Sequence, residues 1–196
     1  VVPAAEGVEA INVPDAKTAL EGARDILMEW FAETADLVAV LRTRLWDQGV
    51  LTSTVMKDKE TAEEEKFRDY YAYAESIKTI PSHRALALFR GRSLGVLKLE
   101  LGLGEALDKV VPHPCVSTIA AHAGIEDRGR SADKWLAGVC EWTRRVKMHL
   151  QISTELLVQL REAAEAEAIK IFARNLHELL LASPAGPKVI LGLDPG

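Results

Sequence analysis

One stretch of this chain, from Thr154 to Ala182, contains neither proline nor glycine, and it constrains the fold more than any other part of the sequence. Its apolar residues recur at helical spacing and form two neighbouring lines on one helix face: Leu157, Leu160, Ala164, Ala168 and Ile171, and Ile169, Phe172, Leu176, Leu179 and Leu180. Ser153 or Thr154 is expected to supply the N-cap oxygen. A helix about 43 Å long is not stable through its own propensity. We therefore expect the rest of the chain to pack along one broad buried face of this helix.

The segment that follows, 184–196, has a different character. Ala185-Gly186-Pro187 is typical of a helix stop, and the apolar run 189–193 is closed by the turn residues Asp194-Pro195-Gly196. The run predicts a buried strand, which needs partner strands, and the sequence ends where these should begin. We interpret the chain as a piece of a longer protein that stops on the first strand of a further domain.

The upstream sequence predicts a mainly α, multihelical domain with a small two-stranded antiparallel β element. Residues 1–14 are expected to form a tail, and the domain is expected to cover 15–183. The strands are predicted at 50–56, which is rich in Val and Thr, and at 95–101, where apolar and polar residues alternate. One helix is predicted to start at the capping box 61–64 and to run through Phe67, Tyr70, Tyr71 and Tyr73. The other helices are predicted at 15–33, 34–49, 82–91, 102–111, 115–123 and 131–150.

Composition excludes several classes of protein. The chain carries 24 basic and 29 acidic residues and a net charge of −5, so no overall positive field attracts nucleic acid, and such a contact requires a local patch. The sequence contains no run of about 18 apolar residues, so no membrane span is predicted, and the N-terminus has no signal-peptide pattern. With only two cysteines, a reduced cytoplasmic setting is the plain interpretation.

No metal, cofactor or catalytic residue is predicted. The residues that commonly bind zinc match no zinc-site spacing: His113, Cys115, His122, Cys140 and His149. Gly102-Leu103-Gly104 lacks the third glycine of a dinucleotide-binding loop and is interpreted as a turn. Asp194 ends an apolar run, but one carboxylate alone does not hold the two metal ions of phosphodiester cleavage.

Three arginines are the candidate phosphate contacts in this chain: Arg84, Arg90 and Arg92, which surround the predicted short helix at 82–91. Two other groups have a functional and a structural interpretation, and we favour the structural one for both. Tyr70, Tyr71 and Tyr73 are more typical of core and boundary positions than of base stacking. The cations at 144–149 are more typical of a solvated helix face.

Several stretches together resemble the Tex family of bacterial transcription accessory proteins. They cover most of 15–196, whereas 102–130 departs from the family pattern, most strongly at 113–124. The resemblance is carried by GARDIL at 22–27, FRDYY at 67–71, IPSHRALALFRG at 80–91, ARNLHELLLA at 173–182, PAGP at 184–187 and LGLDPG at 191–196.

The resemblance implies a large cytoplasmic protein with a helical N-terminal part and a long central helix. An RNase H-like (YqgF-type) domain, helix-hairpin-helix modules and a C-terminal OB-fold RNA-binding domain would follow. This chain would be the helical scaffold between the N-terminal helix-turn-helix region and the RNase H-like domain. Because that domain is usually regarded as catalytically degenerate, the resemblance makes Asp194 a vestigial acid position.

The function expected is therefore that of a scaffold and interaction segment without catalysis in an RNA-binding transcription accessory protein. RNA and DNA would bind mostly through domains that this chain does not contain, the transcription machinery is a candidate partner, and no membrane is involved. The alternative is the N-terminal part of a nuclease resembling the Holliday-junction resolvases, which open on a similar Leu-Gly-Leu-Asp-Pro-Gly strand. That alternative requires further acids downstream.

Overall fold

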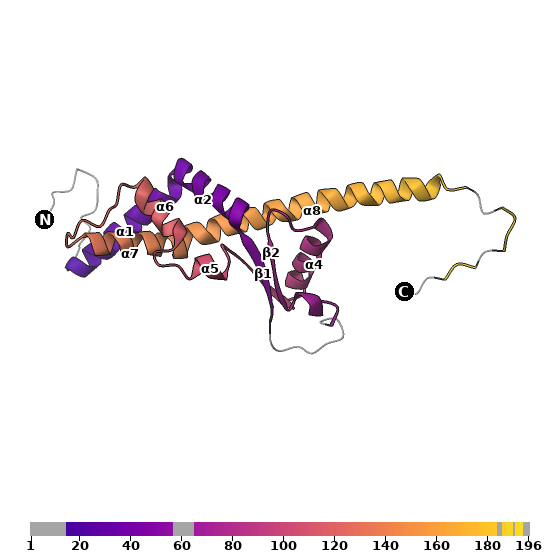
Figure 1. Cartoon of the computed structure of the whole chain (residues 1–196), viewed down its shortest axis with the longest axis horizontal. Coiled ribbons are helices and arrows are strands. Elements are labelled where there is room, and N and C mark those ends of the chain that lie inside the picture. The colour runs from indigo at the N-terminus through magenta and orange to yellow at the C-terminus, as the bar shows by residue number, and fades with distance from the viewer. Residues whose placement is uncertain (1–14, 57–64, 184–185, 190, 194–196) are drawn as a thin grey trace, which may run out of the picture.

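The computed structural model describes residues 15–56, 65–183, 186–189 and 191–193, and it is mainly helical, as predicted (Figure 1). In chain order the elements are α1 (Ala16–Glu33), α2 (Ala35–Gln48), β1 (Val50–Val55), η1 (Arg68–Tyr70), β2 (Ala72–Ser76), α4 (Ser82–Ser93), β3 (Leu97–Gly102), α5 (Glu105–Asp108), α6 (Pro114–His122), α7 (Asp133–Thr143), η2 (Arg144–Met148) and α8 (His149–Leu180). The segment η1 is a 3-10 turn, and η2 is π-helical. No described helix combines the length and the apolar character needed to cross a membrane.

The helix α8 is the C-terminal part of a longer rod. The backbone stays in the right-handed helical region at Thr143 and at Met148, so α7, η2 and α8 follow one another without a break. At 1.5 Å per residue this rod is about 70 Å long. The predicted N-cap at Ser153 or Thr154 is wrong: the Ser153 hydroxyl donates to the His149 carbonyl at 2.6 Å, a bond that serine makes inside helices.

Only the first half of α8 is covered. Ile152, Leu156, Leu157, Leu160 and Ala164 are buried, and α2 and α4 pack on this part of the helix. In contrast, Ile171 is 38% and Phe172 68% exposed, so the prediction of one broad buried face fails beyond Ala164. Beyond α4 the rod projects away from the other labelled elements (Figure 1).

The apolar residues of α8 lie on one side of the helix in its first half and on another side in its second half, a difference that the sequence pattern did not reveal. A helix turns about 100° per residue, so Phe172 lies about 120° around the axis from Leu160. The two predicted lines of apolar residues are therefore not equivalent. The first line meets the upstream elements at Leu157, Leu160 and Ala164. The second line, from Ile169 to Leu180, faces a side that no element in the described part of the chain occupies.

The antiparallel pairing of β1 with β3 is confirmed, with Val50 opposite Gly102 and Val55 opposite Leu97. A third strand, β2, pairs with the other edge of β1, so the order is β2-β1-β3. The sequence predicts a helix through Tyr73, and that prediction is wrong at Ala72 and Tyr73, which belong to β2, whereas Arg68–Tyr70 forms only a 3-10 turn. Alternating exposure from 72 to 74 marks the strand, but two alanines, which favour helices, masked this signal in the sequence.

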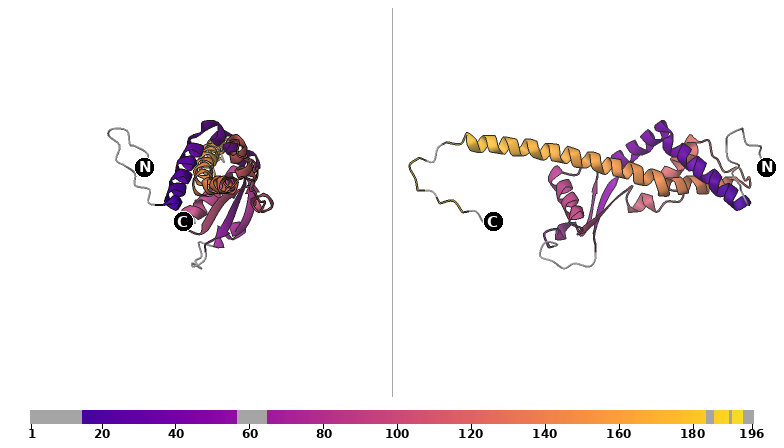
Figure 2. Two further views of the ribbon diagram at one scale, coloured as in Figure 1. Left: turned by 90° about the vertical axis from the view of Figure 1, so that its left-hand side faces the viewer. Right: turned by 180° about the vertical axis from the view of Figure 1, so that it is seen from behind.

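The core lies where the helices and the sheet meet the first half of the rod. Seen from the end, the other elements surround α8 (Figure 2). Asp15 caps α1 as predicted, accepting from the Thr18 N–H at 2.7 Å. The largest fully buried side chains come from each layer: Phe31, Leu37, Leu41, Leu51, Ile77, Leu88, Leu97, Ile119, Met148, Ile152 and Leu156.

Some predictions fall on parts of the chain that the structure does not describe. The tail at 1–14, the capping box at 61–64 and the residues Ile190 and Asp194 lie outside the described residues. The described residues after α8 form neither a helix nor a strand, and Val189, Leu191 and Leu193 are exposed. The three described strands all belong to the sheet around β1. The terminal strand therefore stays a prediction.

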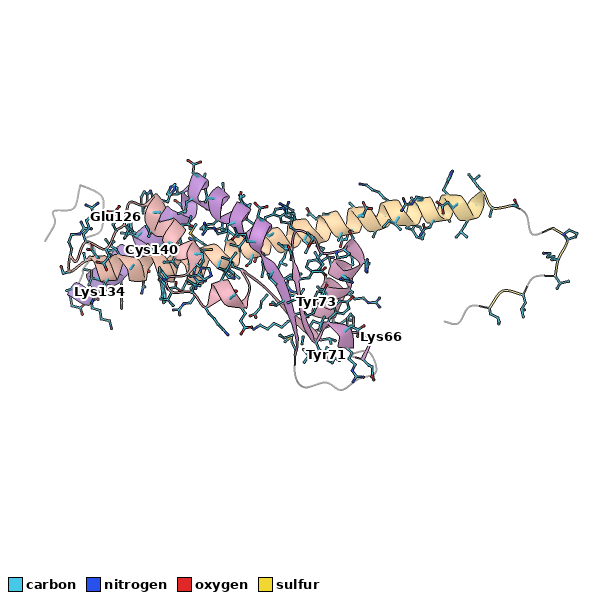
Figure 3. The ribbon with its side chains drawn as sticks, viewed as in Figure 1. Lys66, Tyr71, Tyr73, Glu126, Lys134 and Cys140 are labelled. Atoms are coloured by element: carbon cyan, nitrogen blue, oxygen red, sulfur yellow. The ribbon has the colours of Figure 1, made fainter. Side chains whose placement is uncertain are left out.

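The loop before α7 is held by a buried carboxylate. Asp133 is 3% exposed; its Oδ2 accepts from the backbone N–H groups of Arg128 and Arg130, both at 2.8 Å. Its Oδ1 accepts from the Arg130 guanidinium at 2.9 Å. The Arg130 side chain, followed by these backbone donors, lowers the pKa of Asp133 to about 2. Glu126 and Lys134 lie at this end of the molecule (Figure 3).

We expect Asp133→Asn to flatten the acid limb of the stability curve. Because the pKa of Asp133 is about 2 in the fold against an ordinary 3.8, its contribution is fully present above about pH 4 and is lost as the pH falls toward 2. Urea unfolding of the wild type and the variant at several pH values between about 2 and 6 measures this effect. A control variant, Asp127→Asn, removes an exposed carboxylate in the same loop. Equal slopes for Asp133→Asn and the wild type would contradict the prediction.

Candidate nucleic-acid interface

The helix α4 is rich in basic residues, although the chain as a whole is acidic. It starts after Pro81, whose carbonyl accepts from the N–H groups of Arg84 and Ala85 at 3.0 Å. Its inner face, formed by Ala85, Leu88 and Gly91, is buried, which leaves the cationic residues on the outside. Within Ser82–Ser93 there are three arginines and one histidine but no acid, so α4 produces a local positive field.

Arg84 is engaged with the edge of the sheet. Its Nη1 lies 3.3 and 3.4 Å from the two carboxylate oxygens of Glu75 on β2. The Tyr73 hydroxyl donates to the same carboxylate. Burial, followed by the hydrogen bond to Glu75, raises the pKa of Tyr73, and the Tyr73 and Glu75 side chains raise the pKa of Arg84. An arginine held in this way is less available to a phosphate than one without an acidic neighbour.

Arg90 lies at a hollow of about 420 Å³ between the residues just before η1 and the outer face of α4. We call it the α4 hollow. Phe67, Leu86, Ala87 and Leu94 form its apolar surface, and Lys66, His83 and Arg90 contribute charge or polar nitrogen. Lys66, Tyr71 and Tyr73 lie on the same side of the rod, below it in Figure 3.

Arg92 faces a different place. It lines a hollow of about 360 Å³ between α4 and α8, together with Thr154, Val158 and Arg161. Arg161 is bonded to Glu165 at 2.7 Å. The structure therefore does not bring the three predicted arginines to one surface. That each contacts phosphate stays a prediction, and Arg90 is the one with Lys66 and His83 beside it.

The two groups given a structural interpretation are built into the fold. Tyr70 and Tyr73 pack edge to face with ring centroids 5.3 Å apart, and both lie against the core. Among the cations at 144–149, Arg144 is paired with Glu141 at 2.7 Å, and Lys147 is paired with Glu29 on α1. The guanidinium groups of Arg145 and of Arg24 on α1 lie 5.6 and 4.5 Å from the centre of the Trp142 ring. These contacts join α1 to α7 and η2.

The residues with catalytic or metal-binding chemistry are also engaged. His113 is buried; its Nε2 lies 3.1 Å from Asp108 Oδ1, and its Nδ1 accepts from the Cys115 N–H, which fixes the loop before α6. Burial raises the pKa of both thiols, that of Cys140 to about 11, so both are protonated at neutral pH and poor nucleophiles. In the part of the chain that the structure describes, no three or more His, Cys, Asp or Glu side chains are grouped to hold a metal.

Two further polar residues, which the sequence pattern did not predict, line the candidate interface: Lys66 and His83. Lys66 follows the acidic run at the start of the predicted helix, and that run indicated only a solvated first turn. His83 lies one turn before Ala87 and Arg90 on α4. The spacing of 83, 87, 90 and 94 along a helix was the available signal, because residues three and four apart share a face.

The fold and this interface define a mainly helical domain, built on a long rod, with the basic helix α4 packed on it. The model of the Tex central region-like family matches residues 2–172, and the chain belongs to the Tex family. It is 49% identical over 203 residues to Protein tex of Bordetella pertussis, covering 99% of this chain and 26% of that protein. To the Transcriptional accessory protein Tex of Neisseria gonorrhoeae it is 45% identical over 193 residues, covering 98% and 25%.

A more distant relative is the human S1 RNA-binding domain-containing protein 1, which is 25% identical over 187 residues, covering 89% of this chain and 18% of that protein. The chain thus spans about a quarter of the bacterial relatives it matches and less of the human one. The family resemblance inferred from the sequence is confirmed, and the match extends across the divergent stretch 102–130 as well.

Proposed function

We propose that this chain is a scaffold segment of a nucleic-acid-binding transcription accessory protein, with no catalysis of its own. Relatives named for transcription and for an S1 RNA-binding domain support the setting. The protonated thiols and the His113–Asp108 pair that fixes a loop support the absence of catalysis. In this proposal the protein acts in the cytoplasm, binds RNA or DNA mainly through other domains, and contacts the transcription machinery.

The observation that carries the scaffold role is the bare second half of α8. Its apolar residues fall on one stripe at steps of three and four, the pattern of a helix face that packs on a partner. Large contiguous apolar surfaces are rare on monomeric proteins and mark contact sites. The exposed fractions are 68% for Ile169, 68% for Phe172, 43% for Leu176, 74% for Leu179 and 75% for Leu180.

The occupant that we propose for this stripe is another part of the same, longer polypeptide. The relatives that cover this chain almost completely are about four times as long, so a family member has further chain to place there. Because the stripe lies roughly 100–200° around α8 from Leu160 on the face that α2 and α4 cover, the occupant approaches from a side that they leave free. The rod then joins two bodies instead of belonging to one.

Thiol labelling tests this proposal. We expect Phe172→Cys to react with a maleimide about as fast as an exposed thiol in the 196-residue chain, and at least roughly tenfold more slowly in the complete polypeptide, because a covered residue reacts only when its contact opens. Arg174→Cys, on the opposite side of α8, is the matched control and should react quickly in both. Cys115 and Cys140 are buried and give little background.

The two labelling rates are read together. If Phe172→Cys reacted as fast as Arg174→Cys in the complete polypeptide, the stripe would be uncovered there and the scaffold role would be refuted. If both slowed equally, the cause would be general crowding of the rod, and a specific contact of this stripe would be refuted as well. Slow labelling of Phe172→Cys in the 196-residue chain at high dilution would contradict the 68% exposure of Phe172.

A further inference from the structure

We propose that the α4 hollow binds one unpaired nucleotide of a single-stranded nucleic acid, with the base on the apolar surface and a phosphate between Lys66 and Arg90. This inference rests on the proposed function, since it gives a nucleic-acid-binding protein a contact within this segment. It concerns α4 and the residues before η1 only. The apolar stripe on the distant half of α8 takes no part in it.

The shape of the hollow suits such a ligand. Its volume of about 420 Å³ lies within the range of small-molecule pockets, roughly 300–1,000 Å³. Phe67, which is 6% exposed and held by the core, contributes one part of its surface, and Leu86, Ala87 and Arg90 of α4 contribute another. The inner face of α4 is fixed against the core, because Leu88 is 0% exposed. The parts of the hollow formed by Phe67 and by the backbone of α4 are therefore held in place by the core.

The charge around the hollow suits an anion with a flat apolar body. Among the described residues, Lys66, His83 and Arg90 line it and no carboxylate does. None of these three side chains has an ion pair or hydrogen bond with a residue that the structure describes, whereas Arg84 and Arg144 do. Lys66 and Arg90 therefore place two positive charges beside apolar surface in a chain with a net charge of −5. Proteins that bind single strands combine basic residues along the backbone with flat surfaces under the bases.

The arrangement on α4 also identifies the arginine that would hold the phosphate. Arg90 lines the hollow, where its planar guanidinium can bind a phosphate through two N–H groups or lie against a base. Arg92 is two residues further on and lines the hollow on the α8 side instead. A helix places residues two apart on different faces. Arg92 is therefore a matched control on the same helix with the same change in net charge.

The first experiment measures the binding of a fluorescein-labelled oligouridine of about twelve nucleotides to the 196-residue chain by fluorescence anisotropy. Arg90→Glu is expected to weaken binding at least tenfold and to lower the slope of log K against log salt by about 0.7 for each phosphate that is no longer neutralised. Arg92→Glu is expected to weaken binding by less than about threefold. Both side chains are exposed, so far-UV circular dichroism and the urea midpoint should not change. Equal effects of the two variants on binding would show a general field effect and overturn the proposed site.

A second experiment tests whether the base enters the hollow. An oligomer of the same length with abasic residues keeps the phosphates but lacks the bases, and the wild-type chain is expected to bind it about tenfold more weakly than oligouridine. Ala87→Trp fills the hollow without a change in charge and should abolish that preference. Photocrosslinking of 4-thiouridine in the oligomer should label the peptide 83–94 in the wild type and much less in Ala87→Trp. Equal binding of both oligomers by the wild type would overturn the proposal.

The remaining outcomes separate this inference from the scaffold proposal. If a polyglutamate peptide of the same length competed as well as oligouridine, the hollow would be a site for acidic peptides, and the nucleotide assignment would be overturned. An absence of measurable oligouridine binding to the 196-residue chain would also overturn it. Neither result affects the labelling of Phe172→Cys, on which the scaffold role depends.

Discussion

Replacing Leu156 by alanine is expected to lower the free energy of unfolding of the 196-residue chain by about 2–5 kcal/mol. Leu156 is 1% exposed and lies in the half of α8 that packs against α2 and α4. The ion pair between Arg42 on α2 and Glu155 on α8, at 2.5 Å, places α2 beside this turn. Truncation of the Leu156 side chain takes apolar atoms out of a close-packed core and leaves a cavity. Urea unfolding followed by circular dichroism measures the change in stability.

The control for Leu156→Ala is the same substitution further along the same helix. Leu179 is 74% exposed, so Leu179→Ala is expected to change the free energy of unfolding by no more than about 0.5 kcal/mol. The comparison removes helix propensity as an explanation, because both changes put alanine in place of leucine inside α8. Similar destabilisation of the two variants would mean that the second half of α8 is covered in the isolated chain, contrary to the structure.

Replacing Gly91 by valine is expected to lower the free energy of unfolding by about 3 kcal/mol, the upper end of the usual cost of overpacking. A Cβ at this position would lie 2.5 Å from Leu97 Cδ1 and 3.1 Å from Phe67 Cδ1. Leu97 is 1% and Phe67 6% exposed, so neither side chain has free space to move into. The glycine allows α4 to approach β3 closely. Differential scanning calorimetry or urea unfolding measures the effect.

Gly138→Val is the matched control, in the middle of α7. A Cβ there meets no described atom within 4 Å, and valine is slightly better than glycine in a helix. This variant is expected to stay within about 0.5 kcal/mol of the wild type. If Gly91→Val were as stable as Gly138→Val, α4 would not lie this close to the sheet, and Phe67 would not form a wall of the α4 hollow.

The sequence predicted the elements whose signals are local. The 3.6-residue repeat and the absence of proline identified α8, Asp15 identified the start of α1, and the alternation of apolar and polar residues identified β3. It failed where one local signal has two structural meanings. Ser153 is typical of a cap but bonds to a carbonyl inside the rod, and the alanines at 72 and 74 favour a helix but belong to an edge strand. In both cases tertiary packing, about which the local sequence pattern carries no information, determined which structure forms.

The candidate interface was predicted less well than the fold. The arginines around the helix at 82–91 were identified as the candidate phosphate contacts, but their directions were not known. The packing of α4 on β3 and α8 determines these directions. It places Arg84 beside Glu75, Arg90 at the α4 hollow and Arg92 near α8. Lys66 was missed because it comes from another segment, brought to α4 by the turn at η1.

The sequence by itself determined that a long helix lies in its last quarter, that the class is mainly α, and that the chain resembles the Tex family, because helix formation and motif order depend on residues close together in the chain. Only the tertiary structure decided that α8 is covered as far as Ala164 and bare from Ile169 onward. Which apolar residues are buried depends on how far the other segments reach and from which side they approach. That reach is set by the folding of the whole chain and is not encoded in the spacing of leucines along one helix.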